Sequence, residues 1–181
     1  MTVLQLAKTL SEVPRVPDCP GVVVRNYLGA QDLEPWLALR RAAFARERLG
    51  VRDWTRDDFE AEFLSRWWWR PERMWLAESA TVGVADAASE LRTNPLLIGT
   101  VTLAFRGDED CPVPAVHWLA VHPRYRRRGI GHLLLARLEA AVWQLSLRQI
   151  CLETHDAWKS AENLYRSLGY LPAANRRTAS G

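Results

Sequence analysis

One stretch constrains this fold more than any other: a predicted strand at 115–121 runs through an arginine-rich turn into a long apolar helix. The apolar residues of that helix recur at i, i+3, i+4 and i+7, which is the spacing of one buried face. They are Ile130, Leu133, Leu134, Leu138, Ala141, Val142 and Leu145. A predicted strand at 150–154 and a predicted helix at 160–168 follow. This order of strand, turn, helix, strand and helix indicates an α/β arrangement.

The turn itself predicts a phosphate site. The helix after it has no Ser, Thr, Asp or Asn at its start, so its first backbone N–H groups lack an obvious internal acceptor. Gly129 and Gly131 carry no side chain, which lets a ligand approach the backbone. Such N–H groups and the positive end of the helix dipole favour an anion, and the arginines at 124 and 126–128 add positive charge.

Two other phosphate-binding patterns do not match this turn. A P-loop requires Gly, four residues, and then Gly-Lys followed by Ser or Thr, and the sequence contains no such run. A dinucleotide fingerprint requires a third glycine where this chain has Leu134. The alternative that remains is a glycine-containing turn without a ligand.

The turn and the last predicted helix together resemble a known family. Arg126–Gly131 (RRRGIG) matches motif A of the GCN5-related N-acetyltransferases, Arg/Gln-x-x-Gly-x-Gly/Ala. Ala161–Tyr170 (AENLYRSLGY) resembles that family's motif B, which commonly reads Ala-x-x-Leu-Tyr-x-x-x-Gly-Phe/Tyr. The resemblance is clear over residues 96–172, and the order of elements from residue 21 fits more loosely.

The resemblance implies an α/β (α+β) fold, a central mixed sheet splayed between two parallel strands and flanked by helices on both faces. It implies acetyl-CoA as cosubstrate and a primary amine, on a small molecule or a peptide, as acceptor. The pantetheine arm is expected along the strand at 115–121 and the pyrophosphate on the turn. The implied cofactor-binding residues are Leu119, Ala120, Val121, Arg126, Arg127, Arg128, Gly129, Ile130, Gly131 and His132.

Acetyl transfer to an amine requires a base, because a lysine-like amine has an ordinary pKa of roughly 10.4 and an ammonium has no lone pair. His117 is the first candidate, since it resembles a strand histidine tied to proton removal in the arylalkylamine acetyltransferase branch. That branch has a second histidine where this chain has Ala115. His155, at the end of the next strand, is the second candidate. A hydrogen-bonded strand histidine is the alternative for His117.

The same resemblance makes Tyr165 the predicted acid. A phenol stays protonated at neutral pH and can donate a hydrogen bond to the departing thiolate. A tyrosine packed in the core is the alternative. Trp158 departs from the family pattern, since many relatives carry Asn seven residues before the Tyr.

The first half of the chain predicts the acceptor side. We expect a strand at 22–24, a helix opening at Asp32, and a helix capped by Thr55 that Pro71 ends. Residues 80–95 predict a loop. The tryptophans at 36, 54, 67–69 and 75 gather in this half; three consecutive tryptophans cannot all face one core. They predict either an aromatic acceptor wall or ordinary packing against the sheet or a subunit interface.

We divide the chain into an N-terminal extension or linker (1–20), the acetyltransferase domain (21–175) and a tail (176–181). The segment after Tyr170 is short and contains Pro172, so a full final hairpin is not expected. This leaves room for a homodimer in which a partner chain completes the sheet.

Composition narrows the remaining possibilities. A net charge of +3 does not by itself indicate a nucleic-acid partner, and no apolar run reaches the roughly 20 residues that span a membrane. Three cysteines without ligand spacing predict neither a disulfide framework nor a metal site, which favours a cytoplasmic location. The alternatives to an enzyme are a catalytically silent acyl-CoA-binding sensor or scaffold and a nucleic-acid-binding domain that uses the arginine cluster.

Overall fold

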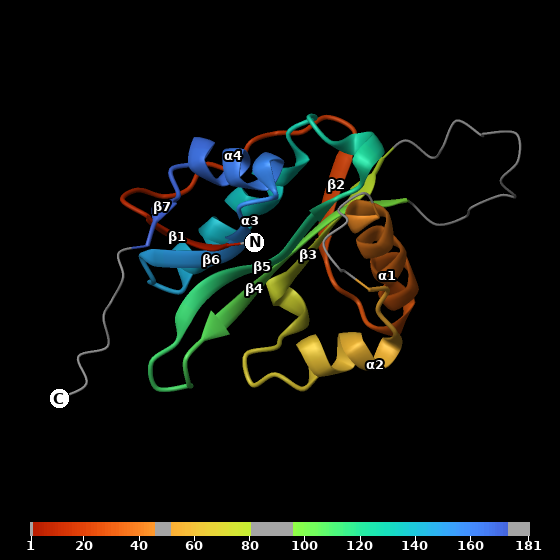
Figure 1. The fold of residues 1–181 in the computed structure, drawn as a ribbon, viewed down its shortest axis with the longest axis horizontal. Helices are drawn as coiled ribbons and strands as arrows, with labels where there is room; N and C mark the ends of the chain where they lie inside the picture. The colour runs from red at the N-terminus through yellow and green to blue at the C-terminus, as the bar shows by residue number, and fades with distance from the viewer. Residues whose placement is uncertain (1, 46–51, 81–95, 174–181) are drawn as a thin grey trace, which may run out of the picture.

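The computed structural model describes residues 2–45, 52–80 and 96–173 and contains one seven-stranded sheet (Figure 1). Its strands lie in the order β2-β3-β4-β5-β6-β1-β7. Neighbouring strands are antiparallel except β5 and β6, which are parallel. The strands are β1 (Val3–Thr9), β2 (Val22–Asn26), β3 (Met74–Ser79), β4 (Leu97–Arg106), β5 (Val113–Val121), β6 (Gln149–His155) and β7 (Leu171–Pro172).

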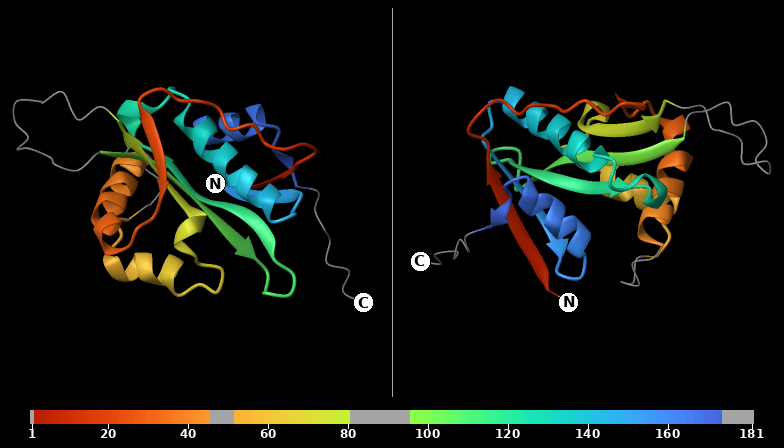
Figure 2. Two further views of the ribbon diagram at one scale, coloured as in Figure 1. Left: turned by 180° about the vertical axis from the view of Figure 1, so that it is seen from behind. Right: turned by 90° about the horizontal axis from the view of Figure 1, so that it is seen from above.

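Helices cover both faces of this sheet, as predicted. The helices are α1 (Ala30–Phe44), α2 (Arg56–Phe59), α3 (Ile130–Gln144) and α4 (Lys159–Ser167); a π-helical turn, η1 (Glu60–Leu64), continues α2. Gly99 of β4 approaches Leu134 of α3, whereas the next residue, Thr100, accepts a hydrogen bond from Trp36 of α1. Because successive strand residues face opposite ways, α1 and α3 lie on opposite faces (Figure 2).

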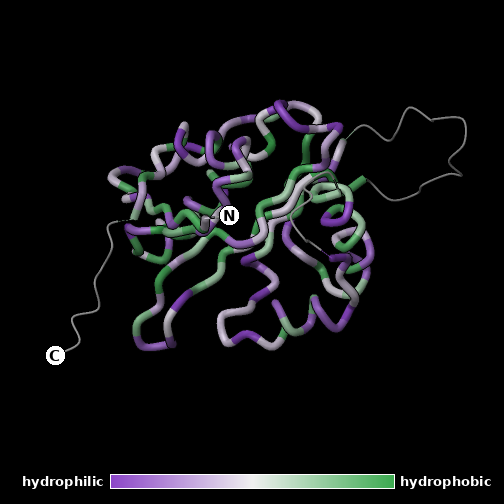
Figure 3. The backbone as a smooth tube through the Cα atoms, in the orientation of Figure 1, coloured by the Kyte–Doolittle hydropathy of each residue, from purple (hydrophilic) through white to green (hydrophobic). Residues whose placement is uncertain are grey.

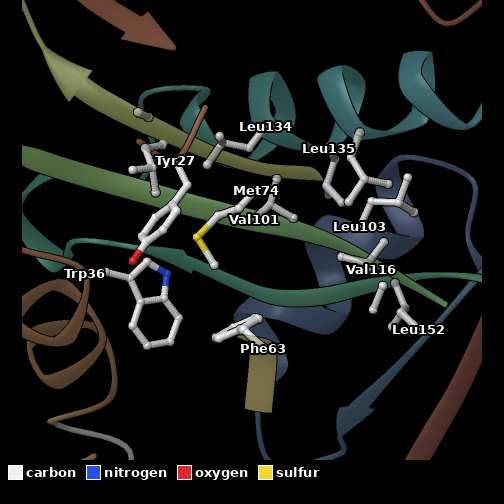
Figure 4. Close-up of a cluster of buried hydrophobic side chains, with 14 of the residues drawn as sticks. Tyr27, Trp36, Phe63, Met74, Val101, Leu103, Val116, Leu134, Leu135 and Leu152 are labelled. Carbon is white, nitrogen blue, oxygen red and sulfur yellow. The ribbon is translucent and has the colours of Figure 1, made fainter. Parts of the chain in front are cut away.

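The hydrophobic core is therefore split by the sheet. Figure 4 shows Leu134 and Leu135 descending from α3 onto one side of the strands, with Trp36 and Phe63 on the other side. All four side chains are at most 1% exposed. Hydrophobic stretches run along the central strands, and hydrophilic stretches concentrate in the outer turns and helix surfaces (Figure 3). Within the described ranges, no helix is long and apolar enough to cross a membrane.

The parallel pair β5–β6 is the place where the sheet opens. These strands are in register at Ala115 and Cys151. Beyond that point β5 continues to Val121 without a further registered partner in β6 among the described residues. The backbone of the second half of β5 thus borders a gap between two strands, as the resemblance implied.

The N-terminal prediction was wrong in one respect: residues 3–9 are not an extension outside the sheet. They form β1, which pairs along its full length with β6, from Val3 opposite His155 to Thr9 opposite Gln149. Lys8 of β1 also makes a 2.7 Å ion pair with Glu139 of α3. Only residues 10–21, which contain three prolines, form the connection to β2.

The same strand corrects the expectation about the end of the chain. β7 is two residues long and pairs with β1, so the chain's own first strand fills the place between β6 and β7. Within the described residues, the chain itself therefore fills the place beside β6, and a homodimer stays a prediction. The predicted tail at 176–181 and almost all of the predicted loop at 80–95 lie outside the described residues.

The helix beginning at Thr55 has the predicted start and a different end. Thr55 and Asp58 form a reciprocal capping box. The helix stops at Leu64, and Pro71 instead begins a short 3-10 turn. In η1 the N–H of Ser65 donates to the carbonyl of Glu60 at 3.0 Å, five residues back, which is the wider spacing of a π-helix. Phe59 and Phe63 are buried, whereas Trp67, which follows this turn, is 38% exposed.

Candidate active site

A cavity of about 910 Å³ opens where β5 and β6 separate. This volume lies in the range of small-molecule sites. Its wall joins both halves of the chain. Of the residues predicted to bind the cofactor, nine line it: Leu119, Ala120, Val121, Arg126, Arg127, Gly129, Ile130, Gly131 and His132. The tenth, Arg128, lies outside the lining.

The start of α3 has backbone groups of the kind that bind an anion. Gly129 is the N-cap residue, with a left-handed φ of 82°, and no described side chain caps the helix. The first backbone bond of α3 runs from the N–H of Leu133 to the carbonyl of Gly129 at 2.9 Å. The amides of Ile130, Gly131 and His132 precede that bond, so they are left for a ligand at the positive end of the helix dipole.

The three arginines of the turn have different surroundings. Arg126 reaches back to the end of α1, donating to the carbonyls of Val121 (3.2 Å) and Ala43 (2.6 Å), so it fixes the turn. The guanidinium of Arg128 lies 5.1 Å from the ring centre of Tyr125. Arg127 has a left-handed φ of 64° and lines the cavity. Of the three, Arg127 is therefore the best placed to meet a phosphate.

Gly131 allows close packing against α4 as well as access to the backbone. A Cβ at this position would lie 2.9 Å from the Cδ2 atom of Leu164 in α4. The two helices therefore touch at the mouth of the phosphate site. A side chain at 131 would therefore require the Leu164 side chain of α4 to move.

A β-bulge in β5 shapes the middle of the cavity. Thr100 pairs with Ala120 and Thr102 with His117, so two residues of β5 stand opposite one of β4. The bulged residue Trp118 has a left-handed φ of 47°, which is strained for a residue with a side chain. The bulge places the side chains of both His117 and Trp118 in the cavity wall.

His117 meets a carboxylate that the sequence analysis did not single out. Its Nε2 atom lies 2.9 Å from Oε1 of Glu62, an ion-pair contact that is not aligned as a hydrogen bond. The indole Nε1–H of Trp118 donates to the same oxygen at 3.2 Å. The pKa of Glu62 is lowered by its contact with His117, and the Trp118 bond adds to this, against the opposing effect of burial.

Tyr165 also lines the cavity, from α4. It is 7% exposed, and burial raises the pKa of its hydroxyl, so the phenol keeps its proton at neutral pH. His155 lies outside the lining, with its ring 5.2 Å from that of Trp158. The structure thus brings Tyr165 and His117 into one cavity and leaves His155 beside it.

Comparison with known proteins decides the family. The sequence model of the acetyltransferase (GNAT) family matches residues 48–170 of the 181. This chain belongs to the GNAT family. The matched range begins before Thr55 and ends at Tyr170, so it includes α2, the turn before α3, and α4, whereas α1 precedes it.

Among curated proteins, this GNAT chain is similar to mycothiol acetyltransferases. It is 29% identical over 157 residues to that of Thermobispora bispora, with 87% of this chain and 48% of the relative covered. It is also 29% identical over 160 residues to that of Nocardia farcinica, covering 87% of this chain and 47% of the relative. The chain thus spans about half the length of the curated relatives it matches.

Solved structures agree on the fold. A GCN5-related N-acetyltransferase from Sphaerobacter thermophilus superposes with a TM-score of 0.71 at 20% identity, covering 94% of this chain and 48% of that one. The acetyltransferase AAC(6')-Iy, solved with a CoA-containing bisubstrate analogue, superposes with a TM-score of 0.56 at 19% identity, covering 84% and 92%. The GNAT fold holds despite the divergent sequence.

The acceptor side of this GNAT domain is lined by aromatic rings. Trp68 is buried and lines the cavity, Trp69 packs against the core, and Trp67 is 38% exposed. Phe44 links the rings of Trp118 (5.8 Å) and Trp158 (5.6 Å). Packing against the core is thus confirmed for Trp69, whereas the acceptor wall stays a prediction, with Trp68 in the cavity lining.

No short-range sequence pattern marks Glu62, because tertiary packing brings it to His117. Glu62 precedes Phe63, which is fully buried, so the carboxylate is fixed at the edge of the core. Its contact with His117 joins residues that are 55 positions apart in the sequence. Glu62 also lies in a π-helical turn, and hydrophobic periodicity does not predict such a turn. Within the described ranges, no group of three acidic, histidine or cysteine side chains comes together to hold a metal ion.

Proposed function

We propose that this chain transfers the acetyl group of acetyl-CoA to a primary amine of a small molecule or a peptide. One observation carries the proposal: the uncapped start of α3 opens onto the gap between β5 and β6. Three consecutive amides there suit a diphosphate, and the unpaired edge of β5 suits the amide groups of a pantetheine arm. Membership in the GNAT family supports the same ligand.

The residues facing this cavity supply the groups that the reaction needs. As the amine nitrogen attacks the thioester carbonyl, its proton passes to His117. When the carbon–sulfur bond breaks, the hydroxyl of Tyr165 donates to the departing thiolate. The half-buried imidazole and the buried phenol line the same cavity, which favours them over His155 for these roles. His155 remains the second candidate base.

The setting of the reaction is part of the proposal. The three cysteines are free thiols, which fits the reducing conditions of the cytoplasm. The aromatic acceptor wall suits an aromatic amine or a cation. Mycothiol acetyltransferases supply a precedent for a small-molecule acceptor.

Binding of CoA tests the cofactor site. Thermal unfolding is measured with CoA and, separately, with pantetheine, which lacks the phosphates. Ligand at one hundred times its dissociation constant stabilises a protein by about 2.7 kcal/mol, so millimolar CoA should raise the Tm by several degrees while pantetheine has a much smaller effect. Equal shifts, or none, would contradict the phosphate role of α3.

Thiol release with a panel of amines then tests catalysis. We expect Tyr165→Phe to bind CoA as the wild type does and to lower kcat about tenfold to a hundredfold, since it removes only the hydroxyl. Tyr170→Phe is the matched control: that hydroxyl lies outside the cavity lining, so kcat should hold. CoA binding without thiol release for any amine would favour the acyl-CoA-binding sensor instead.

A further inference from the structure

We propose that Glu62 is the carboxylate partner of His117: it orients the imidazole and stabilises the positive charge that forms when the acceptor amine loses its proton. Glu62 is thus a positioning residue. This inference rests on the proposed function, and it assigns the acceptor-side turn η1 a part in proton transfer.

The geometry of η1 fixes the carboxylate. Phe63 is fully buried and packs on Trp36 and Phe59 with ring centres 5.3 Å and 4.7 Å away. Because Phe63 anchors the turn in the core, its neighbour Glu62 is held against β5. A π-helical turn is uncommon and is often found at functional sites, where it redirects one side chain.

Two residues of β5, His117 and Trp118, contact the same carboxylate oxygen of Glu62. Oε1 of Glu62 lies 2.9 Å from Nε2 of His117 and accepts the indole hydrogen of Trp118 at 3.2 Å. Trp118 reaches this oxygen from the strained bulge in β5. Since the carboxylate occupies the Nε2 side of the imidazole, it favours the tautomer with the proton on Nε2. Nδ1 is then the nitrogen that takes the amine proton.

The surroundings strengthen this electrostatic contact. The ring of His117 lies 5.7 Å from Phe63, 5.8 Å from Trp68 and 6.0 Å from Trp118. Apolar rings exclude water, so a charge pair among them is screened less than one at the surface. The lowered pKa of Glu62 keeps the carboxylate ionised at neutral pH.

Two cations lie near Glu62, one just after η1 and one in α1. The guanidinium of Arg66, four residues after Glu62, lies 3.6 Å from the other carboxylate oxygen, and the Arg66 side chain is half exposed. Arg40 of α1 lies with its guanidinium 4.1 Å from the ring centre of Trp54 and 4.8 Å from that of Trp118. An arginine side chain does not deprotonate in a protein, so these two charges are the same in the wild type and in a Glu62 variant.

The test compares Glu62→Gln with Glu60→Gln. Glu60 lies in the same turn but is exposed and outside the cavity lining, so it is the matched control. For Glu62→Gln we expect kcat to fall about tenfold or more, with the KM for acetyl-CoA little changed. The acidic limb of the kcat/KM profile should also move to lower pH, because the imidazolium loses its anionic partner. Glu60→Gln should match the wild type in kcat, in the KM for acetyl-CoA and in the position of the acidic limb.

A proton NMR titration of the His117 ring, assigned with His117→Gln, gives a readout that does not require turnover. Its midpoint should fall in Glu62→Gln and stay unchanged in Glu60→Gln. If Glu62→Gln unfolds, Trp118→Phe, which removes one donor to the carboxylate, should show a smaller loss of kcat. An unshifted midpoint or pH limb in a folded Glu62→Gln protein overturns the inference. A wild type that binds CoA but acetylates no amine instead overturns the proposed function.

Discussion

His122 supports the phosphate turn through a single ring nitrogen. Its Nδ1 accepts the backbone N–H of Arg124 at 3.3 Å, at the start of the 3-10 turn Pro123–Tyr125 that precedes the arginines. The bond requires an unprotonated Nδ1. Burial lowers the pKa of His122 below its ordinary value, and the charges of Arg124 and Arg126 lower it further. The site therefore selects the neutral imidazole.

This selection predicts a stability that depends on pH. In the unfolded chain His122 takes up a proton near pH 6.5, whereas in the folded chain it does so only at lower pH. The unfolded state then binds more protons, so stability is full above about pH 6.5 and falls as pH drops through the folded pKa. His122→Asn keeps a side-chain acceptor that does not titrate.

Thermal unfolding from pH 7.5 to pH 5 measures this effect. The Tm of the wild type should fall more steeply below pH 6.5 than the Tm of His122→Asn. Parallel curves for the two proteins would show that His122 contributes nothing to the slope. Asp32 also carries a lowered pKa because of its hydrogen bonds with Arg25, but it is common to both proteins and cancels.

Single residues were predictable where a motif named them, and not where tertiary packing decides. Tyr165 and the turn residues follow from short-range patterns. Glu62 does not follow from such a pattern, because its contact is with His117 in β5, 55 residues later in the sequence. The roles proposed for His117 and His155 remain predictions that the experiments above address.

At the scale of elements, the second half of the chain was easier to predict than the first. The helix predicted from Ile130 is α3, and the strands predicted at 115–121 and 150–154 are β5 and β6 within two residues. Gly169 ends α4 with φ 87°, and the N–H of Tyr170 bonds back to the carbonyl of Tyr165 at 3.0 Å. The bounds of these elements could be predicted because their hydrophobic periodicity is strong and because a glycine with a left-handed φ ends α4.

β1 was not recognised because its pattern is weak. Of its seven residues only Leu6 is buried, and polar residues alternate irregularly with apolar ones. The element is stabilised instead by a contact that no local pattern shows. Lys8 meets Glu139 of α3 at 2.7 Å, with side-chain exposures of 22% and 6%, and its ammonium lies 5.6 Å from the ring centre of Tyr170.

This ion pair should anchor β1 measurably. Lys8→Met leaves the buried carboxylate of Glu139 without its cation, which should cost about 2–3 kcal/mol in the free energy of unfolding. The double variant Lys8→Met/Glu139→Leu should recover most of that loss. Urea titrations measure the free energy of unfolding of the single and of the double variant. Lys159→Met, which breaks an exposed pair with Glu162, should change stability by less than about 0.5 kcal/mol; a similar loss in both single variants would contradict the special role of the buried pair.

For the whole molecule, the family resemblance predicted the architecture correctly, whereas the division at residue 21 left β1 outside the domain. A mixed sheet opened between two parallel strands, with helices on both faces, is present. The resemblance could not show that residues 3–9 insert between β6 and β7, because strand order depends on contacts between distant segments. Since the chain spans about half of its curated relatives, their full activities stay outside what its own fold establishes.

Removing residues 1–10 tests the insertion of β1. The deletion exposes the edge of β6 and the pockets that hold Leu6 and Leu10, both at most 4% exposed. We expect loss of cooperative thermal unfolding and a tendency to aggregate, since an open strand edge pairs with other chains. A synthetic peptide of residues 1–10 added in trans should restore cooperative unfolding, and a scrambled peptide should not. A deleted protein with the Tm of the wild type would show that β1 is dispensable.

The position of β1 has a consequence for biosynthesis. Gln5 and Glu153 are hydrogen-bonded across 148 positions of sequence, so β1 pairs with a strand that the ribosome makes much later than β1 itself. Pairings this distant slow folding and lengthen the time during which a strand edge is unprotected. Until translation has passed β6, the nascent chain must keep this segment from pairing with other polypeptides.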